Sequence, residues 1–122
     1  VELILLAEDE PAVRRSTARL LRGQGYEVLE SENGEEALRL LDGPDGARVQ
    51  LVLSDIVMPV MGGIELAELI SKRGSGPRVL LMSGFSDQGP AAFPFISKPF
   101  ELGSLAAKVR ELLDRERGVQ QA

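Results

Sequence analysis

Short aliphatic runs alternate along the chain with longer stretches in which apolar residues recur at helical spacing. The runs that read as strands cover residues 1–7, 27–30, 49–54, 78–82 and 95–97. The first, third and fourth of them carry no charge after their opening residues, which is typical of strands buried on both faces of a parallel sheet.

The stretches between the runs carry helix start and stop signals. Pro11 stands where a helix should begin, and Gly23 follows the last residue of that pattern. Further helices are predicted over 34–41 and 63–72, and a last one begins near Glu101. Strands that alternate with helices in this way predict an α/β domain with a parallel sheet and right-handed crossovers.

One interval breaks the alternation. Between Ser83 and Lys98 the chain must fit a connection and a fifth strand, and it contains two prolines and two glycines. We therefore expect no regular helix over 85–94, so that the fourth helix of the fold is shortened or absent. Phe85 and Phe93 are then the expected cover for the bare part of the sheet, with a partner surface or a second copy as the alternative.

Composition narrows the possible chemistry. The chain has 122 residues and a net charge of −5, which argues against direct nucleic-acid binding. No apolar run approaches the ~20 residues that a membrane span needs. The chain has no initiating methionine and no cysteine, so we expect a segment of a longer, cytoplasmic protein. It also has no histidine, so catalysis would have to use carboxylates, lysine, serine or the backbone.

Acidic residues gather where two of the predicted strands end. Glu8, Asp9 and Glu10 follow the first strand, and Asp55 follows the third. In parallel sheets, ligands bind beyond the carboxyl ends of the strands, so these acids should share one site. Acids also suit the start of a helix, which suffices to explain Glu10. The remaining cluster needs a cation, and oxygen ligands of this kind favour Mg²⁺ or Mn²⁺.

The same strand ends carry groups that suit an anion. Ser83 closes the fourth run and Lys98 follows the fifth. Asp55 by itself could equally be an aspartate that stabilises a turn or a carboxylate nucleophile that accepts a phosphoryl group. A lysine and a hydroxyl at neighbouring strand ends favour the second interpretation, because both are phosphate partners.

The chain resembles two-component response regulator receiver domains from Val1 to about Arg117, which leaves 118–122 as a polar tail. The resemblance rests on the segments LLAEDEPAVR, VLSDIVMPVMGG, LMSGFSD and FISKPF. It implies a flavodoxin-like, doubly wound sheet of five strands in the order 2-1-3-4-5. It also implies Mg²⁺ and phosphoryl transfer to Asp55 from the phosphohistidine of a histidine kinase or a histidine phosphotransfer protein.

The resemblance also assigns roles within the site. Four residues would hold the metal: Asp9 directly, Glu8 directly or through water, Val57 through its backbone carbonyl, and Asp55. Ser83 and Lys98 would hold the phosphoryl group. Phe95 stands where many receivers have a tyrosine, so it could repack with Ser83 as a switch but could not make the hydrogen bond of a tyrosine hydroxyl. The phrases MSGFSD and KPF are similar to receivers attached to hybrid histidine kinases.

Three other functions compete with a phosphorylated switch. A Mg²⁺-dependent aspartyl-phosphate phosphatase usually has a second carboxylate two residues after its nucleophile, where this chain has Val57. A receiver-like interaction module that is no longer phosphorylated would lack Asp55, Asp9 or Lys98, and all three are present. A nucleotide-binding flavodoxin-like domain is disfavoured because an acidic first loop would repel phosphate. We therefore expect a switch that promotes its own modification and is not a turnover enzyme.

Overall fold

The computed structural model describes residues 1–74, 76–84, 93–98 and 101–121 of the chain. Its elements, in order, are β1 (Leu3–Ala7), α1 (Pro11–Gly23), β2 (Glu27–Ser31), α2 (Gly34–Leu41), a 3₁₀ turn (Gly46–Arg48), β3 (Val49–Asp55), α3 (Gly63–Ser71), β4 (Arg78–Ser83), β5 (Phe95–Ser97) and α4 (Leu102–Gln121). Strands and helices alternate up to β4, as the sequence pattern predicts.

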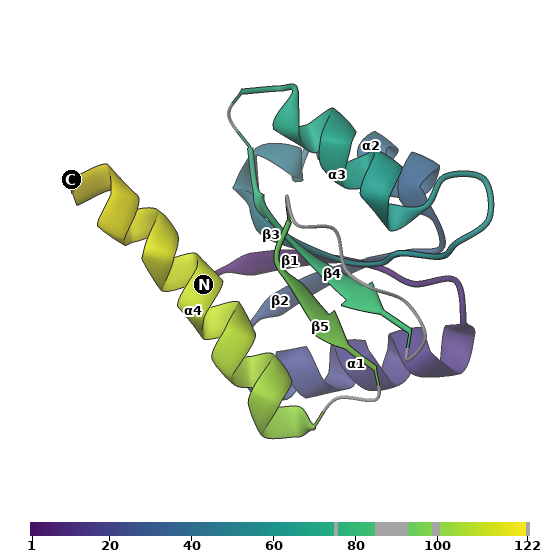
Figure 1. Cartoon of the computed structure of the whole chain (residues 1–122), viewed down its shortest axis with the longest axis horizontal. Coiled ribbons are helices and arrows are strands. Elements are labelled where there is room, and N and C mark those ends of the chain that lie inside the picture. The colour runs from purple at the N-terminus through teal and green to yellow at the C-terminus, as the bar shows by residue number, and fades with distance from the viewer. Residues whose placement is uncertain (75, 85–92, 99–100, 122) are drawn as a thin grey trace.

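The five strands form one parallel sheet in the order β2-β1-β3-β4-β5 (Figure 1). This is the flavodoxin-like order that the sequence predicted. Leu5 of β1 lies between Leu29 of β2 and Val52 of β3, so β1 is an inner strand, as are β3 and β4. Because all strands run the same way, their carboxyl ends meet at one edge of the sheet.

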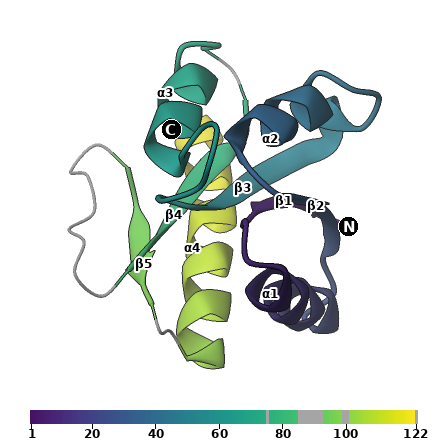
Figure 2. The same cartoon turned by 90° about the vertical axis from the view of Figure 1, so that its right-hand side faces the viewer.

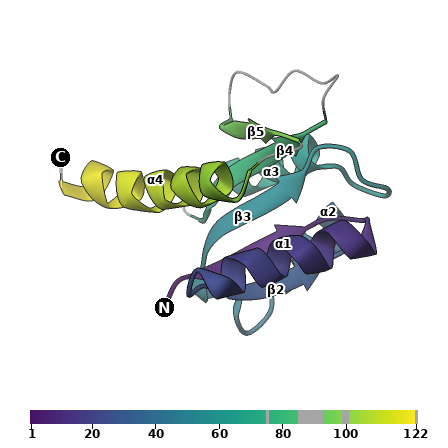
Figure 3. The same cartoon turned by 90° about the horizontal axis from the view of Figure 1, so that it is seen from below.

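Helices cover both faces of the sheet, α1 and α4 on one side and α2 and α3 on the other (Figures 2 and 3). Ile4 and Leu6 of β1 point into the core beneath α1 and α4. Leu3 and Leu5 point into the core beneath α2 and α3. Successive side chains of a strand face opposite sides, so a sheet covered on both sides needs apolar residues at every position. This explains why the inner strands β1, β3 and β4 carry the aliphatic runs.

The connection between β4 and β5 lies partly outside the described residues. We expected no regular helix over 85–94, but residues 85–92, and Phe85 with them, lie outside the described residues, so most of this expectation is untested. Phe93 is described, and it lies partly buried against the core beneath α2 and α3. Phe93 therefore covers part of the sheet from within the chain, as expected for one of the two aromatic residues.

Helix α4 runs to Gln121, so the polar segment expected as a tail after residue 117 is helical over most of its length. The apolar side chains of α4 that pack on the sheet are Leu105, Val109, Leu112 and Leu113. Among the residues that the structure describes, no helix is both long and apolar enough to cross a membrane.

One arginine ties α4 to the opposite end of the chain. The guanidinium of Arg110 donates to the carboxylate of Glu2 at 2.7 Å, to the hydroxyl of Tyr26 at 3.3 Å and to the carboxylate of Asp114 at 3.1 Å. Two of these acceptors lie outside α4, before β1 and before β2. Arg110 therefore links α4 to the beginnings of two strands.

Arg110→Met should lower the free energy of unfolding by about 0.5–1 kcal/mol, because it removes the contacts with Glu2 and Tyr26 from a partly exposed site. Chemical denaturation of the whole chain measures this change. Lys108→Met is the matched control, since Lys108 pairs with Glu111 of the same helix at 3.8 Å. Equal effects of the two substitutions would contradict a link between α4 and the strands.

Candidate functional site

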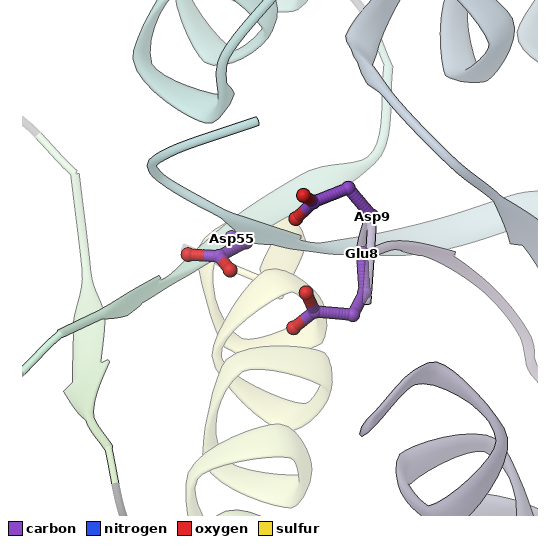
Figure 4. Close-up of side chains that lie close together, drawn as sticks. All are labelled: Glu8, Asp9 and Asp55. Atoms are coloured by element: carbon purple, nitrogen blue, oxygen red, sulfur yellow. The ribbon is translucent and has the colours of Figure 1, made fainter. Parts of the chain in front are cut away.

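Three carboxylates converge at the carboxyl edge of the sheet. Glu8 and Asp9 follow β1, and Asp55 is the last residue of β3. The pairing of Ala7 with Ser54 places these strand ends side by side. One oxygen of each carboxylate lies within 4.8 Å of one oxygen of the other two (Figure 4). Of the acids that the sequence placed at this edge, Glu8, Asp9 and Asp55 converge, and Glu10 lies outside the cluster.

The three carboxylates differ in their access to water. Glu8 is 1% exposed, the side chain of Asp55 is 14% exposed, and Asp9 lies at the surface. Two unit charges ~4 Å apart repel by about 4 kcal/mol at an effective dielectric constant of 20. The cluster therefore requires positive charge close by.

Lys98 supplies one positive charge beside two of the carboxylates. Its ammonium nitrogen lies 2.8 Å from Oε1 of Glu8 and 2.9 Å from Oδ2 of Asp55. The backbone N–H of Lys98 donates to the carbonyl of Ser83 at 2.7 Å, which holds the lysine at the end of β4. Burial disfavours the charged ammonium, but the hydrogen bonds and charges of the two carboxylates outweigh it and raise the pKa of Lys98. Lys98 therefore stays charged and bridges the ends of β1 and β3.

Glu8 is held at its backbone as well as at its carboxylate. Burial raises the pKa of Glu8, although Lys98 and the N–H of Glu10, which donates to Oε2 at 3.2 Å, act against that rise. The backbone N–H of Glu8 donates to the carbonyl of Ser31 at 3.0 Å, and its own carbonyl accepts from Arg14 at 2.8 Å. Each polar part of this residue thus has a partner.

The loop after Asp55 folds back tightly against the end of β3. A side chain on Gly63 would collide with the carbonyl of Asp55, and one on Gly62 would stand 2.6 Å from the carbonyl of Ile56. The N–H of Gly63 donates to that same Ile56 carbonyl at 3.0 Å. The two glycines therefore let α3 begin directly beneath the phosphoacceptor candidate.

The middle of this loop is strained at Val60. Its φ of +69° is rare for a β-branched residue, and the N–H of Met61 donates to the carbonyl of Pro59 at 2.7 Å to close a three-residue turn around it. The turn directs the Met61 carbonyl to the N–H of Gly34 at 2.9 Å, at the start of α2. The loop that begins at Asp55 is therefore joined to both helices on its side of the sheet.

The remaining predicted site residues lie around the carboxylates. Val57 is 67% exposed, and its N–H donates to Oδ1 of Asp55 at a long 3.4 Å. Ser83 is buried at the end of β4, and its hydroxyl donates to the carbonyl of Gly84 at 3.2 Å. Phe95 of β5 pairs with Leu81 of β4 and is 41% exposed. The structure thus brings Glu8, Asp9, Asp55 and Lys98 together, with Ser83 joined to them through the Lys98 backbone.

Arg14, which contacts the carbonyl of Glu8, could not be recognised as a site residue from the sequence. Helix α1 contains four arginines, and nothing in their spacing distinguishes the one that turns toward the site. Only the rotation of α1 against β1 and β2 selects Arg14.

The donor set fits a hard divalent cation. Its three side chains are carboxylates, and one of them lies at the surface, which suits Mg²⁺ or Mn²⁺ with water completing the coordination. Glu8, Asp9 and Asp55 are the side chains that would hold the ion.

A family model for the response regulator receiver domain matches residues 4–110 of the chain. The match covers most of the sequence and includes every candidate site residue. The chain therefore belongs to the response regulator receiver domain family, whose members take part in two-component phosphorelay signalling.

The chain matches a small part of one curated relative and nearly the whole length of another. The sensor kinase CckA of Brucella abortus (strain 2308) is 37% identical over 120 residues, which is 93% of this chain and 13% of CckA. The response regulator receiver protein CpdR of the same strain is 35% identical over 118 residues, which is 90% of this chain and 95% of CpdR. The chain is thus similar both to a small part of a kinase and to a nearly complete receiver protein.

Solved structures of receiver domains and response regulators have the same fold as this chain. The crystal structure of the receiver domain from the hybrid histidine kinase CckA has a TM-score of 0.78 and 37% identity, and covers 91% of this chain and 98% of that one. The response regulator TrrA from Thermotoga maritima, in complex with Mg²⁺-BeF, has a TM-score of 0.80 and 33% identity, and covers 92% and 99%.

Asp9→Asn should raise the melting temperature in Mg²⁺-free buffer, because it removes one of three mutually repelling charges and keeps the shape of the side chain. Thermal unfolding in the presence of a chelator measures the shift. Glu10→Gln is the control, since Glu10 is the neighbouring acid outside the cluster. A melting temperature that falls, or that rises equally in the control, would contradict the repulsion.

Proposed function

We propose that this domain accepts a phosphoryl group on Asp55 from the phosphohistidine of a histidine kinase or a histidine phosphotransfer protein. The observation that carries the proposal is the Lys98 ammonium, which contacts Asp55 and Glu8 at 2.9 and 2.8 Å beside the surface carboxylate of Asp9. A nucleophile, a cation and a metal-binding acid pair at one sheet edge are what phosphoryl transfer requires. The Mg²⁺-BeF complex of TrrA supports a divalent cation at this site.

In the proposed step, a carboxylate oxygen of Asp55 forms a bond to phosphorus while the bond from phosphorus to the imidazole nitrogen breaks. The nitrogen keeps the electron pair of that bond, and Asp55 becomes a mixed acid anhydride. Mg²⁺, when bound, supplies positive charge that neutralises the phosphoryl oxygens. The protein contributes positioning and charge, and little covalent chemistry.

Lys98 and Ser83 are the proposed partners of the phosphoryl group. Lys98 already contacts Asp55, so its ammonium can transfer a hydrogen bond from the carboxylate to a phosphoryl oxygen without leaving the site. The Ser83 hydroxyl, which donates to Gly84, would exchange that acceptor for a phosphoryl oxygen. Movement of Ser83, with repacking of the half-exposed Phe95, is the proposed switch, because a ligand shifts a two-state equilibrium only through contacts that differ between the states.

The domain is proposed to act as a switch that promotes its own phosphorylation and slow dephosphorylation, with residues 1–117 as its receiver part and a cytoplasmic location. Its similarity to CckA suggests that it can belong to a hybrid kinase, and its similarity to CpdR suggests a single-domain regulator. Both settings place a phosphohistidine donor upstream of Asp55.

Intact mass spectrometry after incubation with a small-molecule phosphodonor and Mg²⁺ tests the acceptor. The wild type should gain the mass of one phosphoryl group, and Asp55→Asn should gain none, because an amide cannot act as the nucleophile. Asp45→Asn, which changes an acid paired with Arg48 in another part of the fold, should react like the wild type. Stable phosphorylation of Asp55→Asn would refute the assignment.

The phosphorylated form should be long-lived, because the exposed side chain of Val57 beside Asp55 offers an attacking water no hydrogen bond. Val57→Asn should shorten the half-life of the phosphorylated protein several-fold, followed by the loss of the added mass with time. Val57→Leu, which keeps the site apolar, is the control. Equal hydrolysis rates in Val57→Asn and the wild type would remove this explanation.

A further inference from the structure

We infer that Arg14 is a positioning residue for the metal-binding acids, acting through the backbone carbonyl of Glu8. The inference deepens the proposed function and rests on it, since it concerns the same site. It assigns a role to a side chain that touches neither a phosphoryl group nor a metal ligand atom.

The contacts of Arg14 point in two directions. Its Nη1 donates to the carbonyl of Glu8 at 2.8 Å, and its Nε lies 3.6 Å from the carboxylate of Glu30 in β2. Only 14% of the Arg14 side chain is exposed, so these contacts are largely shielded from water. The Nη1 and Nε donors of a planar guanidinium stand in a fixed geometry, so they hold two acceptors in set directions, whereas the donors of a lysine ammonium rotate.

The carbonyl of Glu8 belongs to the peptide unit that joins Glu8 to Asp9. A peptide unit is planar and includes the Cα atoms of both residues, so a hydrogen bond to its oxygen also helps to fix the position of the Asp9 Cα. The N–H of Glu8 donates to Ser31 at 3.0 Å and fixes the preceding peptide unit. By holding this peptide unit, Arg14 constrains the direction of the Asp9 side chain. The carboxylate of Asp9 lies close to those of Glu8 and Asp55 (Figure 4).

Glu30 is itself held in place by a second arginine. Nη1 of Arg22 lies 3.1 Å from the Glu30 carboxylate, and its Nη2 donates to the carbonyl of Val28 at 3.0 Å. Arg22 thus holds the Glu30 carboxylate in place, and Arg14 connects that carboxylate to the carbonyl of Glu8. Both arginines come from α1 and share Glu30, but Arg14 is the one bonded to the Glu8 carbonyl.

The shared partner makes Arg22→Met a matched control for Arg14→Met. Each substitution removes one guanidinium from the same helix and one ion pair with Glu30, and methionine keeps an aliphatic stem. The Arg14 side chain is 14% exposed and that of Arg22 is 51% exposed, so a merely structural role predicts a larger loss of stability in Arg14→Met but unchanged Mg²⁺ binding in both folded variants. A positioning role predicts that Arg14→Met alone alters the binding of Mg²⁺.

The experiment titrates Mg²⁺ into the whole 122-residue chain by calorimetry, at a temperature where all variants are folded. Loss of a group that orients metal ligands typically weakens metal binding by 10–100-fold, so Arg14→Met should raise the dissociation constant about tenfold. Arg14→Lys should fall between Arg14→Met and the wild type, which keeps the test usable if the methionine variant folds poorly. Arg22→Met should stay within about twofold of the wild type, because it leaves the Glu8 carbonyl bond intact.

A second measurement needs no metal. The backbone carbonyl carbon of Glu8 and the N–H of Asp9 belong to the same peptide unit, so their NMR chemical shifts should change in Arg14→Met and keep their wild-type values in Arg22→Met. Shifts that change equally in the two variants would overturn the inference.

The titration separates the two levels of the proposal. Wild-type protein that binds Mg²⁺ together with Arg14→Met of unchanged affinity would overturn the role of Arg14 and leave the proposed function standing. Wild-type protein that binds no Mg²⁺ would contradict the proposed function, and the positioning role would fall with it.

Discussion

Three carboxylates must share one end of the sheet with one ammonium group, and the rest of the site follows from that constraint. When ionised, the three carboxylates of Glu8, Asp9 and Asp55 carry a charge of −3. Lys98 contributes +1, so the site has a net charge of −2. A divalent cation would balance that remainder. Because Glu8 is buried, the charges cannot be relieved by water alone, so the fold has to hold Lys98 at the point where it meets both acids.

The parallel sheet makes this arrangement possible with few residues. Strand β1 lies beside β3, and β3 lies beside β4, so their last residues are neighbours although long connections separate them in the sequence. Glycines 62 and 63 then bring the start of α3 against the backbone at the end of β3. The strained turn at Val60 completes this loop and ties it to α2. The site is therefore built on the ends of paired strands, and the loop after Asp55 is held against them by backbone contacts.

The aliphatic runs and the acids at their ends were enough to predict the α/β sheet and the meeting of Glu8, Asp9 and Asp55, because a doubly covered parallel sheet leaves few other arrangements. Lys98 was predicted as a phosphate partner, but its simultaneous contact with Glu8 and Asp55 depends on how β5 ends. Arg14 could not be predicted, since its contact depends on the rotation of a helix with four arginines. Sequence pattern thus defines which backbone ends meet, whereas side-chain geometry decides which charges pair.

The ion pairs of Lys98 span 90 residues to Glu8 and 43 residues to Asp55, and this separation has a consequence for biosynthesis. A chain emerging from the ribosome exposes both acids long before the lysine has been made. The contacts that complete the site are among the most non-local in the fold, so they can form only after the sheet has been assembled as far as β5. A truncated or half-folded chain would carry the aspartate without the lysine that neutralises it. Only a fully translated and folded domain would therefore have the complete site.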